Sequence, residues 1–122
     1  MKPSPTSIQV AVVEDRPEEL EFFRGLLSTS PGFACAAACG SATQALEILP
    51  QRRPEIVLMD IQLPDLSGIE CVHRLSQTLF GTQFMMLTVL DDHDLIFRSL
   101  AAGATGYLLK KTPPDKILAA IR

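Results

Sequence analysis

Several apolar runs of this chain end on charged residues, which could together form a catalytic or metal-binding site. These charged residues are Glu14 and Asp15 after the first run, Asp60 after a central run, and Lys110 near the end of the chain. The run before Asp60, residues 56–59, has four consecutive apolar residues, two of them β-branched, which is typical of a strand buried on both faces of a parallel sheet. Parallel sheets bring functional groups to the carboxyl ends of their strands. The sequence therefore predicts a polar pocket of three carboxylates and one ammonium at one edge of a sheet.

The chemistry of such a pocket follows from its charges. Three carboxylates in one cleft repel one another, so their pKa values rise or a cation neutralises them. Mg²⁺ suits this role because it takes one or two carboxylates, keeps several waters and accepts phosphate oxygens. One Mg²⁺ and the Lys110 ammonium balance the three acids, and a phosphoryl group on Asp60 then leaves a net charge of about −1. The residues therefore predict phosphoryl transfer with the Asp60 carboxylate as covalent nucleophile.

The elements that must position these residues alternate between strand and helix, which is typical of an α/β sheet with helices on both faces. The expected strands are residues 8–13, 33–38, 56–59, 84–87 and 106–109, and the expected helices are residues 17–28, 41–49, 68–79, 91–102 and 112–122. Pro50 and Pro54 are expected to bracket the link into the third strand, and Thr112 to cap the last helix.

Composition and charge exclude several classes of protein. At 122 residues the chain is expected to form one domain. No apolar run approaches the roughly 20 residues of a membrane span, and residues 1–7 lack the apolar core of a secretory signal, so they are expected to form a disordered tail. The net charge of −3 argues against DNA binding by this piece alone.

The remaining candidate ligands are expected to be structural. Cys35 and Cys39 share one strand and lie too far apart for a disulfide, so they and Cys71 are expected to be buried thiols, which suits a reducing cytoplasm. The two histidines are expected on helices without a catalytic role. Asp65, Asp91, Asp92 and Asp94 are expected to be loop and helix-cap residues.

From residue 8 to residue 122 the chain resembles the receiver domain of two-component response regulators. The resemblance rests on Glu14-Asp15 after the first strand, Asp60 after the third, Thr88 after the fourth, and Tyr107 with Lys110 on the fifth. Residues 58–68 are similar to the family's phosphorylation loop, and residues 103–110 with Thr112-Pro113 look like the NarL/FixJ branch. The resemblance implies a flavodoxin-like, five-stranded parallel sheet in the order 2-1-3-4-5 with helices on both faces.

The resemblance also assigns roles in the pocket. Asp60 is expected to accept a phosphoryl group from the phosphohistidine of a partner sensor histidine kinase. Glu14 and Asp15 are expected to hold Mg²⁺ together with Asp60 and the backbone carbonyl of Gln62, while Lys110 pairs with the phosphoryl oxygens.

Two further residues are expected to relay the change. By the resemblance, Thr88 donates its hydroxyl to the phosphoryl group, and its movement leaves room for Tyr107 to turn inward. Tyr107 has a second interpretation as a half-buried packing residue, and both can hold in different states. One departure is that Lys111 follows Lys110 where many receivers have proline.

For the parent protein, the resemblance implies a cytoplasmic transcription regulator. The receiver domain is expected to span residues 8–122 and to precede a helix-turn-helix domain, so DNA is contacted only through a domain absent from this chain. A homodimer is expected on phosphorylation. The domain is expected to catalyse only its own phosphorylation and dephosphorylation, and not to be an enzyme for an external metabolite.

Two rival functions fit the residues less well. A haloacid-dehalogenase-like phosphatase also begins with an aspartate after a buried strand, but its general acid lies two residues on, where this chain has Gln62, and no cap segment is present. A plain nucleotide-binding α/β domain needs a glycine-rich phosphate loop, whereas Gly103 and Gly106 follow a helix instead of opening one.

Overall fold

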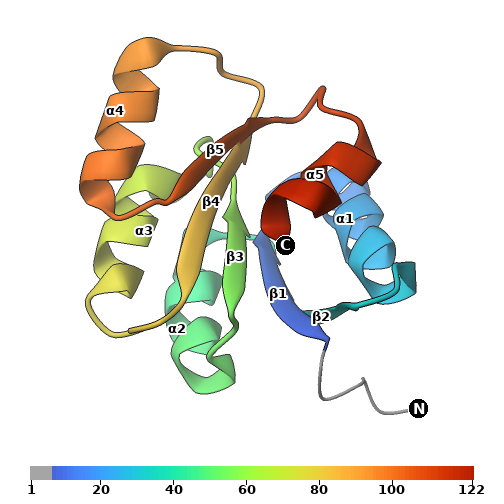
Figure 1. Cartoon of the computed structure of the whole chain (residues 1–122). Coiled ribbons are helices and arrows are strands. Elements are labelled where there is room, and N and C mark those ends of the chain that lie inside the picture. The colour runs from blue at the N-terminus through green and yellow to red at the C-terminus, as the bar shows by residue number, and fades with distance from the viewer. Residues whose placement is uncertain (1–6) are drawn as a thin grey trace.

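The computed structural model describes residues 7–122, in which five strands and five helices alternate along the chain (Figure 1). The strands are β1 (Ile8–Val13), β2 (Phe33–Cys39), β3 (Ile56–Met59), β4 (Gln83–Thr88) and β5 (Gly106–Leu109). The helices are α1 (Pro17–Thr29), α2 (Ala42–Arg52), α3 (Gly68–Ser76), α4 (His93–Ala102) and α5 (Pro114–Ile121). Of the predicted tail, residues 1–6 lie outside the described residues, and Ser7 is buried.

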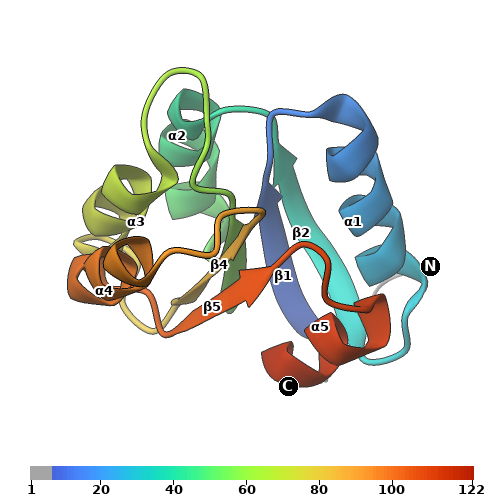
Figure 2. The same ribbon diagram turned by 90° about the horizontal axis from the view of Figure 1, so that it is seen from above.

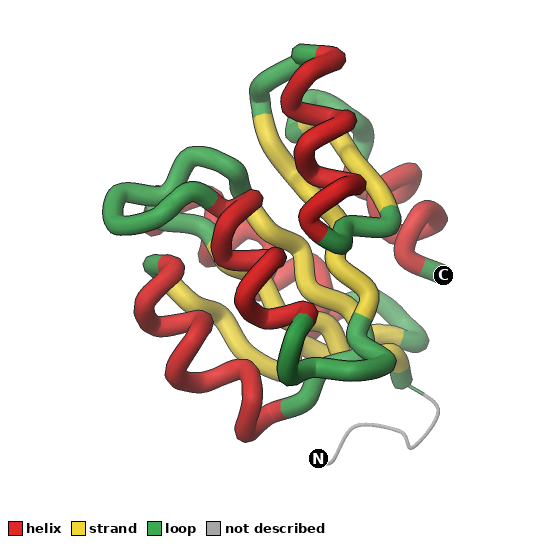
Figure 3. Tube along the Cα trace, turned by 90° about the vertical axis from the view of Figure 1, so that its left-hand side faces the viewer, coloured by secondary structure: helices red, strands yellow, loops and turns green. Residues whose placement is uncertain are grey.

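The five strands form one sheet in the order β2-β1-β3-β4-β5, and every neighbouring pair is parallel. Both the predicted fold class and the predicted strand order are therefore confirmed. The sheet is the middle layer of the molecule, with helices along both of its faces (Figure 3). Because β1 and β3 are adjacent inner strands, the acids that follow them are brought to the same edge.

Alternation along the buried strands divides the core into two clusters. In β1, Val10 and Val12 belong to the cluster that includes residues of α1 and α5, whereas Ala11 and Val13 belong to the cluster that includes residues of α2 and α3. Figure 2 shows α1 and α5 on one side of the sheet and α2, α3 and α4 on the other. Because the sheet is covered on both faces, β3 is a continuous apolar run, and β1 and β4 depart from this only at Gln9, Gln83 and Thr88.

Two predicted helix boundaries on the α2 side are wrong. Helix α2 continues to Arg52, with Pro50 inside it, because Leu49 is fully buried and its carbonyl accepts the N–H of Arg53 at 2.8 Å. Arg53, in the left-handed conformation with φ of 46°, then ends the helix. Helix α3 ends at Ser76 instead of residue 79, and Leu79 stays buried by closing a turn onto the Leu75 carbonyl at 2.8 Å.

The expected cap of the last helix is also wrong. The residue before α5 is Pro113, whose side chain has no hydrogen-bond acceptor, and Pro114 is the first helical residue. Thr112 instead closes the preceding turn, donating its N–H to the Leu109 carbonyl at 3.0 Å.

The structure also tests the expected burial of the cysteines and the length and apolar character of the helices. All three cysteines are free thiols; Cys39 and Cys71 are buried, whereas Cys35 is half-buried, so its expected burial is wrong in degree. Cys35 lies on β2, which is an edge strand because, within residues 7–122, it pairs with β1 alone. None of the helices in the described part of the chain has the length and apolar character that a membrane crossing requires.

Candidate functional site

Backbone hydrogen bonds extend the sheet by one residue at its carboxyl edge and fix the charged residues there. The N–H of Asp60 donates to the Val13 carbonyl at 3.1 Å, which places Asp60 beside Glu14, the residue after Val13. The N–H of Lys110 donates to the Thr88 carbonyl at 2.8 Å. Glu14, Asp60 and Lys110 are far apart in the sequence, but all three follow strand ends at the same edge of the sheet.

Three carboxylates meet at this edge. Glu14, Asp15 and Asp60 each offer an oxygen, and these oxygens lie within 4.8 Å of one another. Glu14 and Asp60 are buried, whereas Asp15 is exposed. They adjoin a pocket of about 210 Å³, which is lined by Asp15, Arg16, Asp60, Gln62, Val89 and Lys110. An open, all-oxygen set of this kind fits Mg²⁺, which prefers carboxylates and retains waters.

The Lys110 ammonium lies among acidic groups. It donates to the carboxylates of Glu14, Glu19 and Asp60, the last at 3.0 Å from Asp60 Oδ2. The side chains of Lys110, Glu14 and Asp60 are 11%, 3% and 7% exposed. Buried charges of this kind persist only when they are paired, so the ammonium neutralises carboxylates that the fold holds away from water.

Burial and pairing shift the pKa values in this cluster. Burial raises the pKa of Glu14 to about 7, although hydrogen bonds from the Arg16 N–H and the Lys110 ammonium favour its charged form. Burial alone lowers the pKa of Lys110, but its bonds to Glu14, Glu19 and Asp60 outweigh that effect and raise it. Burial and ion pairing thus act in opposite directions on Glu14, whereas ion pairing prevails at Lys110 and favours its charged form.

The loop after Asp60 folds back against that residue at its far end, where α3 begins. The Gly68 N–H donates to the Ile61 carbonyl at 2.9 Å, and a Cβ at Gly68 would lie 1.9 Å from the Asp60 carbonyl oxygen. Only glycine allows the start of α3 to approach this closely. The Gln62 N–H donates to Asp60 Oδ1 at 3.2 Å, which orients the carboxylate and leaves Oδ2 to Lys110.

Asp65 ties the same loop to the start of α2. Its carboxylate accepts the N–H of Ala42 at 3.1 Å and that of Thr43 at 2.7 Å, and also the Thr43 hydroxyl. The Thr43 hydroxyl is the main cause that lowers the pKa of Asp65 to about 2. Asp65 is therefore a helix cap from a distant loop, and Asp92 is a local cap of α4, as the sequence predicts for both.

Thr88 and Tyr107 are linked through Leu90. The Thr88 hydroxyl is fully buried and accepts the Leu90 N–H at 3.4 Å. The Tyr107 hydroxyl donates to the Leu90 carbonyl at 2.6 Å, and its half-buried ring packs against the core cluster that contains β4 residues. The structure thus connects these two residues to each other through one backbone segment, next to the strand end that carries Lys110.

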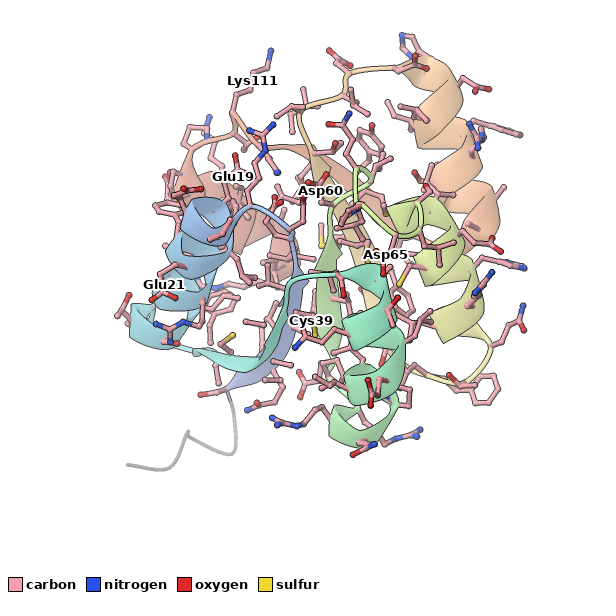
Figure 4. All side chains as sticks on the ribbon, turned by 180° about the vertical axis from the view of Figure 1, so that it is seen from behind. Glu19, Glu21, Cys39, Asp60, Asp65 and Lys111 are labelled. Atoms are coloured by element: carbon pink, nitrogen blue, oxygen red, sulfur yellow. The ribbon has the colours of Figure 1, made fainter. Side chains whose placement is uncertain are left out.

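Glu19 is a site residue that sequence analysis missed. It lies in the first turn of α1, where an acidic residue also favours the helix dipole, and it accepts a hydrogen bond from the Lys110 ammonium. This bond lowers the pKa of Glu19. Figure 4 shows Glu19 at the end of α1 that faces the Asp60 edge of the sheet. The sequence signal for this role is its position, because Glu19 lies about one helical turn beyond Glu14-Asp15.

Known proteins resemble this chain over most of its length. The profile of the response regulator receiver domain family matches residues 10–122. Transcriptional regulatory protein UhpA of Escherichia coli is 38% identical over 93% of this chain and 57% of UhpA. Nitrate/nitrite response regulator protein NarP of the same species is 32% identical over 98% of this chain and 56% of NarP. The chain thus spans little more than half the length of these relatives.

A solved structure gives the same result in three dimensions. The two-component response regulator of the LuxR family from Aurantimonas sp. SI85-9A1 superposes with a TM-score of 0.88 at 29% identity, over 94% of this chain and 82% of that chain. The likeness extends over the sheet and the helices on both of its faces.

Proposed function

Because this chain belongs to the response regulator receiver domain family of two-component systems, we propose that it is a phosphorylation switch whose phosphoacceptor is Asp60. A receiver domain is a switch and not a conventional enzyme. The observation that carries the proposal is the Asp60 carboxylate, which lies 3.0 Å from the Lys110 ammonium and beside two further acids in an open pocket.

The reaction is a transfer between two nucleophiles. An Asp60 carboxylate oxygen attacks the phosphorus of a kinase phosphohistidine, the P–N bond breaks, and the histidine imidazole leaves with the bonding electron pair and takes up a proton. Lys110 donates to a phosphoryl oxygen as charge develops there. Glu14, Asp15, Asp60 and the Gln62 carbonyl would hold Mg²⁺, which neutralises charge on the transferring phosphoryl group.

The partners follow from the family. A receiver implies a cognate histidine kinase, and the curated relatives are transcription regulators. We propose that the parent protein is a cytoplasmic transcription regulator, with residues 8–122 as its receiver, that contacts DNA through a helix-turn-helix domain. The net charge of −3 supports a role for this domain in signalling and not in DNA contact. We also propose that phosphorylation favours a homodimer.

A small acyl phosphate tests the switch chemistry without the kinase. Incubated with such a donor and Mg²⁺, the chain is expected to gain the mass of one phosphoryl group, and to gain none when a chelator removes the metal. Intact-mass spectrometry measures both. Mg²⁺ binding without any gain in mass, from either an acyl phosphate or a phosphorylated kinase, would contradict the proposal.

We further propose that Thr88 and Tyr107 relay the change. Two hydrogen bonds support this route: the Leu90 N–H donates to the Thr88 hydroxyl, and the Tyr107 hydroxyl donates to the Leu90 carbonyl. A Thr88 hydroxyl that moves toward the phosphoryl group draws away from the Leu90 N–H, which frees the segment that holds Tyr107. Tyr107 is the only tyrosine and the chain has no tryptophan, so intrinsic fluorescence reports on this side chain alone.

The relay predicts a specific optical signal. Phosphorylation is expected to change the tyrosine fluorescence of the unmodified chain, whereas Thr88→Ala should take up phosphate and leave the fluorescence unchanged. Fluorescence and mass are measured on the same sample. A full fluorescence change in phosphorylated Thr88→Ala would remove Thr88 from the relay.

A further inference from the structure

Every N–H donor of the Lys110 ammonium is occupied in this structure. A lysine ammonium has three N–H donors, and Lys110 directs them to Glu14, Glu19 and Asp60. A phosphoryl oxygen can therefore bind Lys110 only if one of these carboxylates gives up its place.

The cost of release differs among the three partners. Glu14 and Asp60 have side chains that are 3% and 7% exposed, so in the resting domain without metal either would become an unpaired buried charge. The side chain of Glu19 is 32% exposed, so its carboxylate can turn toward water. Glu19 is therefore the partner whose release costs least.

Glu19 also has a second cation beside it. Its Oε2 bonds to Lys110, while its Oε1 lies 4.0 Å from the guanidinium of Arg16, whose side chain is 68% exposed and borders the pocket. A carboxylate that leaves Lys110 thus moves from one cation to another along the first turn of α1.

We propose that Glu19 is a latch on Lys110, which holds the ammonium in the resting domain and must move to Arg16 before Lys110 binds a phosphoryl oxygen. This inference rests on the proposed phosphorylation of Asp60. Glu19 is a positioning residue in this scheme, because it acts through Lys110 and does not touch the phosphoryl group. The latch opposes phosphorylation and makes the resting state more persistent.

Two substitutions separate contact from charge. Glu19→Gln removes the charge, whereas Glu19→Asp keeps the charge and draws the carboxylate back by one methylene. Glu18→Gln is the matched control, because Glu18 is the preceding residue of the same turn and is exposed. Calorimetric titration with fluoroberyllate and Mg²⁺ gives the affinity for a phosphoryl mimic, and titration with Mg²⁺ alone gives the metal affinity.

Both Glu19 variants are expected to bind fluoroberyllate about two- to fivefold more tightly than the unmodified chain, the range for a partly exposed ion pair. The acyl-phosphate concentration at half-maximal rate should fall by a similar factor. Glu18→Gln should match the unmodified chain, and Glu19→Asp should leave the affinity for Mg²⁺ alone unchanged.

Two results would overturn the latch. They are a Glu19→Asp affinity equal to that of the unmodified chain, and weaker binding by both variants. The first would show that Glu19 acts only through its charge at a distance. The second would show that its contact with Lys110 promotes binding of the phosphoryl mimic. An unmodified chain that takes up neither fluoroberyllate nor a phosphoryl group would instead overturn the proposed function, and the latch with it.

Discussion

Asp60→Asn is expected to abolish phosphorylation by both an acyl phosphate and a kinase, while the domain stays folded. The side-chain amide is too weak a nucleophile to attack phosphorus, so no phosphoryl mass should appear. The fold should persist because the asparagine oxygen can still accept the Gln62 N–H that Asp60 Oδ1 accepts at 3.2 Å. Without metal, the variant should be at least as stable as the unmodified chain, since one of three mutually repelling carboxylates is gone.

Intact mass and thermal unfolding check this prediction on one preparation. Asp94→Asn is the matched control, since Asp94 is exposed on α4 and, among the described residues, its carboxylate forms an ion pair only with Arg98, at 3.8 Å. The control should gain one phosphoryl group at the normal rate. A phosphoryl group retained by Asp60→Asn would show that a different residue is the acceptor.

Lys110→Ala is expected to have the largest effect on stability. Removing the ammonium leaves Glu14 and Asp60 as buried carboxylates without their common partner. Breaking a buried ion pair on one side typically costs about 3 kcal/mol, so we expect a loss of this order in the free energy of unfolding at neutral pH without metal. Mg²⁺ should restore most of it, because a cation bound only by the folded state stabilises that state.

The same variant is expected to be a poor switch. A charge-assisted hydrogen bond to a phosphoryl oxygen is worth about 2 kcal/mol, so the affinity for fluoroberyllate should fall roughly thirtyfold. Denaturant unfolding with and without Mg²⁺ measures the stability, and calorimetry measures the affinity. Lys111→Ala is the control, since Figure 4 shows Lys111 pointing away from the site. Equal stabilities for the two variants in metal-free buffer would contradict the buried ion pair.

The stability of Lys110→Ala should also depend on pH. Burial raises the pKa of Glu14 from 4.5 to about 7 in the unmodified chain, and Lys110 holds it lower than burial alone would. The stability tied to a raised pKa is present below 4.5 and is lost as the pH rises through the folded value. Without Lys110 this pKa rises further, so the deficit of the variant should be small near about pH 5 and larger near about pH 8.

Local signals in the sequence predict the strands and several helix ends well. Each inner strand is a short apolar run, and Asp92 and Gly103 bound α4 as expected, Gly103 with the positive φ of 123° that glycine favours at a helix end. The predictions at Pro50 and Thr112 are wrong because burial of the neighbouring residues, and not the local residue type, decides where these helices end and begin. In α2 the burial of Leu49 outweighs the proline signal.

By itself, the sequence determined the sheet, its strand order by family resemblance, and the charged residue at the end of each functional strand. It could do so because the hydrophobic pattern of a strand and the residue that follows it are local features of the sequence. In addition, the carboxyl ends of parallel strands lie at one edge of the sheet. Only the tertiary structure decided which side chains meet there. Glu19 and Lys110 are 91 residues apart, and Asp65 caps a helix that begins 23 residues earlier. No periodicity encodes such contacts, since they depend on how α1 and the loop after β3 pack against the finished sheet.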